Sequence, residues 1–556
     1  EMAKKMGHFN VVIEPLSNAR LHSITDGYPE GRGNYQFLLI MVGLSVLILI
    51  LSIVNYINLA TANAVKRAKE VGVRKVVGAS KGTIVIQFIF ETALISLFSI
   101  LLALVIVELT LPYYNDFLNK SLRIIGSQFY LQLILIFCIT VLVAGILPAV
   151  YVANFETLKV LKGNFGRSKN GIWLRNGMLI FQFTVATFFI VGSYIVYQQI
   201  DYLTNKDLGF KGDQVMEINL NFLDSDYEVE NVGQNIYNKY STIKQELAKI
   251  KGVEQASTGL ISFDGSDDSL GGVLYNDELF KARTIAVDFG MFEMMKIEVV
   301  KGRSLDQQHA SDTIASVVIN ETAQKLMNMK EPIGKELIIK ERKLKIIGVV
   351  KDFNLLSPEV EVSGMYFYHL KTVDIAQNIN KVFVKLKLDN IENTITDIEK
   401  LWAKTDTEYP FKYDFVDKQY ARTYESYVKQ KNLFSLLNVV VILIALFGLF
   451  ALASYSIQRR MKEIAIRKTL GAETSLLLKE LSKQYVLYCV IGFLIALFPT
   501  YYLLNMWLEN FAFRIEMTLF PFLFGFIILL VLTLIIVLLR AYQATKTDVL
   551  KYLKYE

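Results

Sequence analysis

The side chains whose types and spacing suggest a shared task lie in a charged motif that occurs twice. Residues 66–79 read KRAKEVGVRKVVGA, and residues 459–472, 393 positions later, read RRMKEIAIRKTLGA. The matched positions include Lys69, Glu70, Arg74, Lys75, Gly78 and Ala79 in the first copy and Lys462, Glu463, Arg467, Lys468, Gly471 and Ala472 in the second. Such side chains can pair with each other, with lipid headgroups or with another protein. The motif therefore indicates recognition rather than catalysis.

A short amphipathic helix is the element expected to present each copy. Glu70 precedes Arg74 by four residues, and Glu463 precedes Arg467 by four, which is the favourable order for an ion pair on a helix. The glycine near the end of each copy suits a helix C-terminus, and Ser80 suits the start of the next helix. Apolar residues lie around the charged ones of the first copy: Val71, Val73, Val76 and Val77.

The residues alone leave three roles open for these helices. They anchor the protein at anionic lipid headgroups, they dock a cytoplasmic partner, or they bind nucleic acid. Because acidic, basic and glycine positions all repeat, beyond basic charge alone, the pattern favours a docking surface. Two such surfaces suggest a partner with two-fold symmetry.

Seven apolar segments, each long enough to cross a bilayer as a helix, dominate the chain. A span needs about 20 apolar residues, and 53% of the 556 residues are hydrophobic while 20% are charged. This composition excludes a disordered, a collagen-like and a disulfide-stapled secreted chain. We expect a polytopic α-helical membrane protein. The segments are 37–60, 84–111, 129–152, 174–197, 434–457, 485–506 and 519–539.

Lysine and arginine predict the orientation of the spans. They are concentrated in the loops after the first, third and fifth segments and in the tail after the seventh, and both motif copies lie in these loops. We therefore expect these loops and the C-terminus in the cytoplasm and residues 1–36 outside. Because residues 1–36 contain no export signal and the sequence begins with Glu1, we also expect a fragment with at least one further span upstream.

Residues 199–432, between the fourth and fifth spans, are expected to form one large domain outside the cytoplasm. Short strand-like runs alternate there with helical patterns, which predicts an α/β or α+β fold. The acidic segment 264–268 is interpreted as a solvated turn, because it lacks the ligand spacing of known calcium loops. The strand-like runs are 215–220, 316–319, 336–339, 345–350 and 381–388, and the helical patterns are 232–250 and 391–404.

Three tyrosines recur at helical spacing just before the fifth span, namely Tyr420, Tyr424 and Tyr427. They predict a packed helical stalk between the outside domain and the membrane. A stiff stalk of this kind would also transmit movement.

No set of residues predicts catalysis or metal binding. The sequence has no G-x-x-x-x-G-K-[ST] phosphate loop, and its four histidines are dispersed. Cys138 and Cys489 lie within apolar runs and predict no disulfide framework. Glu91, in the second span, has two possible roles, a functional acid or a residue that packs or snorkels. We favour packing or snorkelling. We expect no catalytic residue, no metal site and no cofactor in this chain.

The sequence resembles the permease subunits of MacB/FtsX-type ABC transporters, and most closely large permeases of that type from Bacteroidetes. Residues 55–62 (NYINLATA) with the first motif copy, and Ser454 with the second, carry this similarity. Residues 206–210 (KDLGF) and 348–354 (GVVKDFN) resemble segments of the periplasmic core domain. Residues 15–22 (PLSNARLH) resemble the end of a first such domain.

The resemblance implies a particular organisation. Members of this type would have eight spans, in the order span, periplasmic domain, three spans, and then the same again. Here residues 1–36 would end a first periplasmic domain, and residues 174–198 would be the span that leads to a MacB-like periplasmic core domain at 199–432. Residues 37–163 and 433–556 would be two tandem, parallel FtsX-like three-span units.

The resemblance also implies a function. The chain would be a non-enzymatic permease subunit of the bacterial inner membrane. It would couple a cytoplasmic ATPase dimer, which holds the ATP and Mg²⁺, to movement of the periplasmic domain and act on periplasmic or membrane-embedded cargo. The two motif copies would dock the ATPase. A permease homodimer or pseudo-dimer, a periplasmic adaptor and membrane lipid are further expected partners, whereas nucleic acid is not. The alternative is a membrane receptor that senses peptides or envelope state and signals to a cytoplasmic partner.

Overall fold

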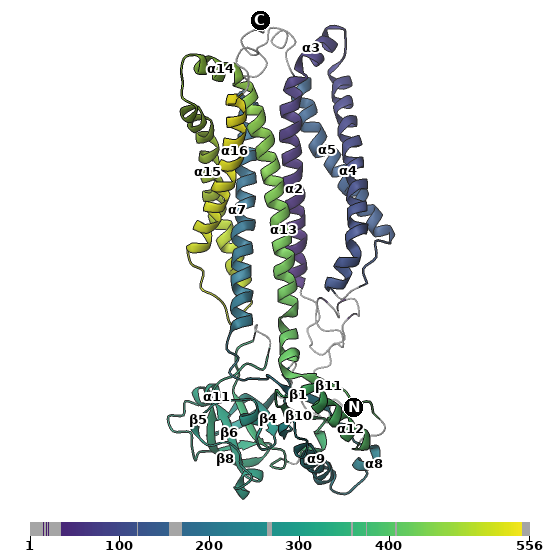
Figure 1. Cartoon of the computed structure of the whole chain (residues 1–556), viewed down its shortest axis with the longest axis vertical. Helices are drawn as coiled ribbons and strands as arrows, with labels where there is room; N and C mark the ends of the chain where they lie inside the picture. Colours follow the sequence, from purple (N-terminus) through teal and green to yellow (C-terminus); the bar gives the residue numbers. More distant parts are fainter. Residues whose placement is uncertain are drawn as a thin grey trace. The chain divides into compact units, whose positions relative to one another are not determined.

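The computed structural model of the chain describes residues 15, 18, 21, 35–118, 121–154, 169–263, 270–356, 360–373, 375–405 and 409–546. The chain divides into two compact units. The helical unit takes in the chain up to Tyr194 together with Phe434–Tyr502 and the chain from Thr518 onward, and the mixed unit consists of Ile195–Leu433 and Leu503–Met517. Figure 1 shows both units and labels many of their elements with the names used below.

The helical unit contains the same sequence of elements twice, namely a long helix, a short helix and two long helices. The first set is α2 (Tyr35–Lys66), α3 (Ala68–Val76), α4 (Lys81–Leu118) and α5 (Ser127–Ala153). The second set is α13 (Val416–Arg459), α14 (Met461–Thr469), α15 (Thr474–Leu508) and α16 (Phe520–Lys546). Helix α7 (Lys169–Asn205) lies between the two sets in the sequence. The prediction of two tandem three-span units is confirmed.

Within the described residues, seven helices are long and apolar enough to cross a membrane. They coincide with the seven segments expected from the sequence, but several are longer. Helix α4 begins at Lys81 and α13 begins at Val416, both well before the apolar part. The apolar segment marks only what a bilayer requires, whereas the helical backbone pairs its own hydrogen-bonding groups and therefore continues through polar turns.

Small residues allow the helices of the second set to approach α7 closely. A Cβ atom built on Gly492 of α15 would lie 2.6 Å from the Cβ atom of Phe183 on α7, so a larger residue there would force the helices apart. The hydroxyl of Thr184 donates a hydrogen bond to the Gly492 carbonyl at 3.2 Å. Phe183 and its neighbours on α7 share one apolar core with α13, α15 and α16.

The mixed unit contains two sheets. The smaller sheet is antiparallel, in the order β11-β1-β10-β2. The residues of α9 that face its core recur every three or four positions, as Ile236, Tyr240, Ile243 and Leu247, all buried. The elements of this part are β1 (Val215–Asn219), α8 (Asp224–Tyr227), α9 (Val232–Ala248), β2 (Val253–Ser257), η3 (Ala376–Asn378), β10 (Lys381–Leu386), α12 (Ile391–Thr405) and β11 (Tyr413–Phe415).

The larger sheet is mixed and closes on itself. Its order is β5-β8-β6-β9-β4-β3-β7, and β7 also pairs with β8, so that six of its seven strands form a closed ring with β5 at the side. Closure leaves no free edge among those six strands. Its strands are β3 (Leu270–Tyr275), β4 (Glu278–Val287), β5 (Val299–Gly302), β6 (Ser316–Asn320), β7 (Glu336–Ile339), β8 (Arg342–Val350) and β9 (Met365–His369), with α10 (Met291–Met294), η2 (Ala310–Thr313) and α11 (Glu321–Leu326) between them.

The predicted α+β character of this unit is confirmed. All five strand-like runs are strands, as β1, β6, β7, β8 and β10, and both helical patterns are helices, as α9 and α12. Six of the strands, namely β2, β3, β4, β5, β9 and β11, were not predicted. Strand β9 shows one reason. It reads MYFYH and is buried along its whole length between β6 and β4, so it has no alternation of polar and apolar residues that would reveal a strand. The acidic segment 264–268 lies outside the described residues.

The three tyrosines expected to form a stalk lie at the start of α13. Tyr420, Tyr424 and Tyr427 lie on α13 and are buried. The Tyr420 hydroxyl donates to the Leu356 carbonyl at 3.2 Å, and the Tyr427 ring lies 5.4 Å, centroid to centroid, from Phe511. These contacts are all within the mixed unit and fix the first turns of α13 there.

Candidate functional site

The two copies of the charged motif form α3 and α14, and the expected ion pairs are present. Glu70 lies 2.8 Å from Arg74 on α3, and Glu463 lies 2.8 Å from Arg467 on α14. Each pair spans one helical turn with the acid first. Ser80 begins the next helix as expected, because its Oγ accepts a hydrogen bond from the Thr83 amide at 3.1 Å.

The repeated Gly-Ala pair ends each helix in the same way. Gly78 and Gly471 have positive φ values of 106° and 88°, a conformation that residues with a side chain rarely adopt. The amides of Gly78 and Ala79 donate to the carbonyls of Lys75 and Arg74 at 3.1 and 2.9 Å. The corresponding distances in the second copy are 3.1 and 3.0 Å. Both ends are therefore Schellman motifs, and the Gly-Ala repeat sets where the helix stops.

The repeated lysines tie each short helix to the end of the third long helix of its own set. Lys75 Nζ donates to the carbonyl of Ala153 at the end of α5, at 2.8 Å. Lys468 Nζ donates to the carbonyl of Thr545 near the end of α16. A cation near a helix C-terminus also interacts favourably with the helix dipole. Burial lowers the pKa of Lys75 below its ordinary value, with a smaller effect from Lys81.

The repeated arginines tie each short helix to the second long helix of its set. Arg74 donates to the side chain of Gln87 on α4, and Arg467 pairs with Glu480 on α15. These two partners occupy matching positions in the two copies. The arginine and lysine contacts therefore fix α3 against α4 and α5, and α14 against α15 and α16.

Apolar side chains divide each short helix into a buried and an outward face. Val71 packs with Ile84 and Val152, and Ile464 packs with Leu477 and Leu481. The residue before each terminal glycine faces outward instead, with Val77 82% exposed and Leu470 81% exposed. Val73 and Ile466, also at matching positions, are exposed as well. Lys462 is exposed, whereas the side chain of Lys69 lies outside the described residues.

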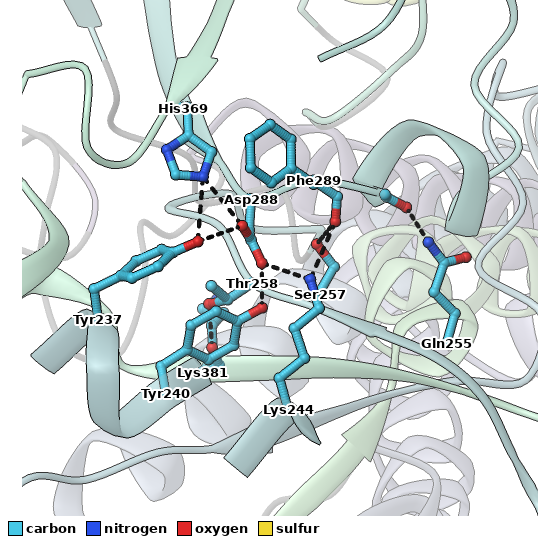
Figure 2. Close-up of polar contacts among 11 residues, drawn as sticks. Tyr237, Tyr240, Lys244, Gln255, Ser257, Thr258, Asp288, Phe289, His369 and Lys381 are labelled. Carbon is cyan, nitrogen blue, oxygen red and sulfur yellow. Dashed lines mark hydrogen bonds and ion pairs between the residues drawn. The ribbon is translucent and has the colours of Figure 1, made fainter. Parts of the chain in front are cut away.

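A second polar cluster lies in the mixed unit, around the buried carboxylate of Asp288 (Figure 2). Its Oδ1 accepts from Tyr237 at 3.0 Å and lies 3.2 Å from Nε2 of His369. Its Oδ2 accepts from Tyr240 at 2.6 Å and from Lys244 at 2.7 Å. The three α9 residues therefore meet Asp288, which follows β4, and His369, which ends β9.

The electrostatics of this cluster indicate a fixed, ionised carboxylate. Burial alone would raise the pKa of Asp288, but the hydrogen bond from His369 and the ammonium of Lys244 outweigh it and hold the pKa well below its ordinary value. Burial, and then the charge of Asp288, raise the pKa of Tyr240, so its hydroxyl remains a donor. The Lys371 amide donates to Nδ1 of His369 at 3.2 Å, which places the imidazole proton on Nε2, facing Asp288.

The arrangement around Asp288 fits a structural role better than a catalytic one. Each oxygen of Asp288 already accepts two hydrogen bonds, so the carboxylate has no free position from which to take a proton. The cluster instead joins α9, which packs on the small sheet, to the ends of two strands of the large sheet. Among the described residues, no three His, Cys, Asp or Glu side chains come together as metal ligands.

Sequence reasoning missed this cluster because its members are spread over more than 130 positions. One signal was present. Tyr237, Tyr240 and Lys244 lie three and four residues apart, on one face of a helix whose other positions predict a core. Nothing in the sequence indicates that Asp288 and His369, 81 residues apart, meet this face.

Together these features define a class of protein. It has a helical unit with seven candidate spans, in which a span, a short charged helix and two further spans occur twice, and a folded α+β unit inserted between the two sets. The short helices are joined to the long helices by side-chain hydrogen bonds and ion pairs, and they expose apolar residues at matching positions. This is the organisation of a polytopic membrane protein with a large folded domain inserted between two similar sets of spans.

Comparisons with known proteins give the family. Residues 42–157 and 435–549 each match the FtsX-like permease C-terminal family, and residues 184–401 match the MacB-like periplasmic core domain. The chain belongs to the MacB/FtsX type of ABC transporter permeases.

Several curated relatives share part of the sequence. One is the macrolide export ATP-binding/permease protein MacB of Neisseria meningitidis, 27% identical over 237 residues. That match covers 41% of this chain and 36% of the relative, so the chain spans about a third of the length of the first curated relatives it matches. Another is an uncharacterized ABC transporter permease of Methanocaldococcus jannaschii, 26% identical over 42% of this chain and 58% of that protein.

Several solved structures are similar to part of the chain, among them the following two. The periplasmic region of MacB from Actinobacillus actinomycetemcomitans has 20% identity and a TM-score of 0.29, over 38% of this chain and 92% of that one. The extracellular domain of the transporter YknZ from Gram-positive bacteria has 16% identity and a TM-score of 0.27, over 36% of this chain and 98% of that one. At these scores the likeness adds nothing to the family matches.

Proposed function

We propose that this chain is a permease subunit that couples ATP hydrolysis by a separate cytoplasmic ATPase to movement of its α+β domain. It lies in a bacterial inner membrane, with the α+β domain in the periplasm and the C-terminus, α3 and α14 in the cytoplasm. The excess of lysine and arginine in the loops that contain α3 and α14 supports this orientation. Residues 1–556 contain no phosphate-binding loop, and we assign ATP and Mg²⁺ to the ATPase.

The observation that carries the proposal is the matching way in which α3 and α14 are joined to the long helices of their sets. In both, an arginine side chain bonds the second long helix, a lysine bonds the end of the third, and a Schellman motif closes the helix. A force on such a helix moves the spans instead of bending the loop. Two equal sites fit a partner with two equivalent subunits, such as an ATPase dimer.

The docking contacts are divided between two kinds of residue. The apolar residues Val77 and Leu470, with Val73 and Ile466 beside them, form the surface that a partner buries, because exposed apolar side chains outside the membrane gain most from contact. Glu70, Arg74, Glu463 and Arg467 hold this surface in shape and supply charges at its rim. The six repeated positions of each copy thus support docking partly by holding the short helix in its conformation.

Transmission follows from two unbroken helices. Helix α7 ends in the α+β unit and α13 begins there, and each helix is continuous with its part in the helical unit. The buried tyrosines Tyr420, Tyr424 and Tyr427 fix α13 to the α+β unit. Displacement of the spans therefore reaches this unit by rigid-body movement. The cargo is periplasmic or membrane-embedded, and transport across the bilayer is not required.

Co-purification tests the proposal. The tagged chain is extracted from its native membrane, and the amount of co-purifying ATPase is measured for wild type and for a variant with Val77→Glu and Leu470→Glu. Each change buries a charge in the proposed contact and should cost about 2 kcal/mol, so the pair weakens binding by about a thousandfold. Both side chains are more than four-fifths exposed, so the fold should not change.

The matched control carries Leu279→Glu and Leu388→Glu, two similarly exposed leucines of the α+β unit. It should retain the ATPase. Equal ATPase recovery from wild type and the Val77/Leu470 variant would show that this surface does not dock the ATPase. Recovery of a sensor kinase in place of an ATPase would favour a receptor instead.

A further inference from the structure

The two motif copies differ in how they neutralise one arginine. In the first copy, Arg67 forms a bidentate pair with Glu91, with nitrogen–oxygen distances of 2.8 and 3.2 Å, and a further contact with Glu70 at 3.2 Å. Arg460 occupies the matching position of the second copy, and Gln484 stands where Glu91 would be. The carboxylate that neutralises the arginine in the first copy is therefore an uncharged amide in the second.

No carboxylate replaces it for Arg460 among the described residues. The Gln484 amide donates to the Tyr488 hydroxyl at 2.5 Å. Glu463 and Glu480, which line a small pocket together with Arg460, both pair with Arg467. Among the described residues, Arg460 thus lacks the internal carboxylate partner that its counterpart Arg67 has.

This arginine lines a cavity of about 380 Å³ within the helical unit. Arg175 at the start of α7 and Arg459 at the end of α13 line the same space, and Glu463 is the only acid among its lining residues. The Arg175 guanidinium lies 5.2 Å from the centre of the Tyr455 ring, which orients it. The balance of charge around the cavity is positive.

The lining changes from charged to apolar along the helices. On α7, Leu179 follows Arg175 by one turn, and on α13, Leu452 precedes Arg459 by about two turns. Tyr485 and Tyr488 face the space from α15. A ligand that fits this gradient has an anionic head and an apolar part directly attached to it.

We propose that this cavity binds a phosphate group, and that the phosphate belongs to the headgroup of an anionic phospholipid. Arginine is suited to the task, because its planar guanidinium donates two parallel hydrogen bonds to phosphate oxygens. Free phosphate offers the same oxygens but leaves the leucines without a partner. A volume of this size accommodates a small ligand or a headgroup with its glycerol. The site goes beyond the proposed function, because it requires no ATPase.

Native mass spectrometry of the full chain in a neutral detergent tests the assignment. The probes are dioleoyl phosphatidylglycerol, dioleoyl phosphatidylcholine and inorganic phosphate. Wild type should retain phosphatidylglycerol in preference to phosphatidylcholine. Arg460→Gln should lower its retention about tenfold, since a charge-assisted bidentate contact is lost. Gln484→Glu should do the same without removing any positive charge, because it restores the internal partner seen in the first copy.

The matched control is Arg67→Gln, which removes the corresponding arginine of the first copy and should leave phosphatidylglycerol retention unchanged. Gel filtration of each variant checks that the chain is folded. Equal retention by wild type, Arg460→Gln and Gln484→Glu, or equal retention of the two lipids by wild type, overturns the proposal. Competition by inorganic phosphate against bound phosphatidylglycerol supports it, whereas binding of phosphate without phosphatidylglycerol overturns the lipid assignment.

Discussion

Replacing Asp288 with asparagine should loosen the contact between the two sheets of the α+β unit. Asp288 accepts hydrogen bonds from Tyr237, Tyr240, Lys244 and His369, and its side chain is buried. Asparagine keeps the size but removes the charge, and its amide N–H groups face donors where the carboxylate accepted. Breaking a buried, hydrogen-bonded charge pair typically costs 3–5 kcal/mol. Because Lys244 is partly exposed and can rehydrate, we expect about 3 kcal/mol.

Hydrogen exchange read by mass spectrometry measures this effect in the full chain. Peptides from α9 and β4 should exchange roughly a hundredfold faster in Asp288→Asn at pH 7. The difference should depend on pH. The folded-state pKa of Asp288 lies below its unfolded value, so its stabilisation is complete above about pH 4 and is lost as the pH falls below that. Wild type should therefore approach the variant in acid.

A surface change on the same helix is the control. Glu246 pairs with Lys249 in an exposed position. Glu246→Gln should therefore alter the free energy of opening of α9, as read from exchange, by less than about 0.5 kcal/mol. If Asp288→Asn exchanged no faster than this control, the cluster would not join the two sheets. A difference that stayed constant down to pH 2 would refute the assignment of a depressed pKa.

Two further predictions concern the construction of α3 and α14. Gly78→Ala and Gly471→Ala should each destabilise the end of the short helix by about 1 kcal/mol, because alanine resists positive φ. Exchange of the α3 and α14 amides should rise accordingly, whereas Gly43→Ala, in open space within α2, should not raise it. Lys75→Met and Lys468→Met should each raise exchange of the same helix about fivefold, since a hydrogen bond to the long helix is lost. Unchanged exchange in the lysine variants would show that these bonds do not fix the helices.

Local patterns in the sequence predicted much of the fold. The seven spans follow from apolar length alone, because a bilayer imposes that length. Helices α3 and α14 follow from an acid–base spacing of four and a terminal glycine. In the α+β unit, the period of the apolar residues predicted α9 and α12, and runs of β-branched residues predicted β6 and β8.

The roles of the motif residues could not be predicted in the same way, because they depend on partners far along the chain. Lys75 bonds a carbonyl 78 residues away, and Arg67 pairs with a glutamate 24 residues away. Both contacts require the helices to be packed first. The same limit applies to the cavity around Arg460 and to Asp288, whose neighbours come from several elements. The sequence identified the charged positions but not which of them face inward.

In the proposed mechanism, α3 and α14 receive ATP-driven movement and pass it to the α+β domain. Spin labels at Tyr113→Cys and Glu399→Cys, in a Cys138→Ser background, place one probe on an exposed position of each unit. Pulsed dipolar spectroscopy then compares the purified complex with its ATPase before and after addition of ATP and Mg²⁺. We predict a change in the label–label distance distribution that Val77→Glu with Leu470→Glu abolishes. A distribution unaffected by ATP in wild type, or an equal shift in that variant, would contradict the account.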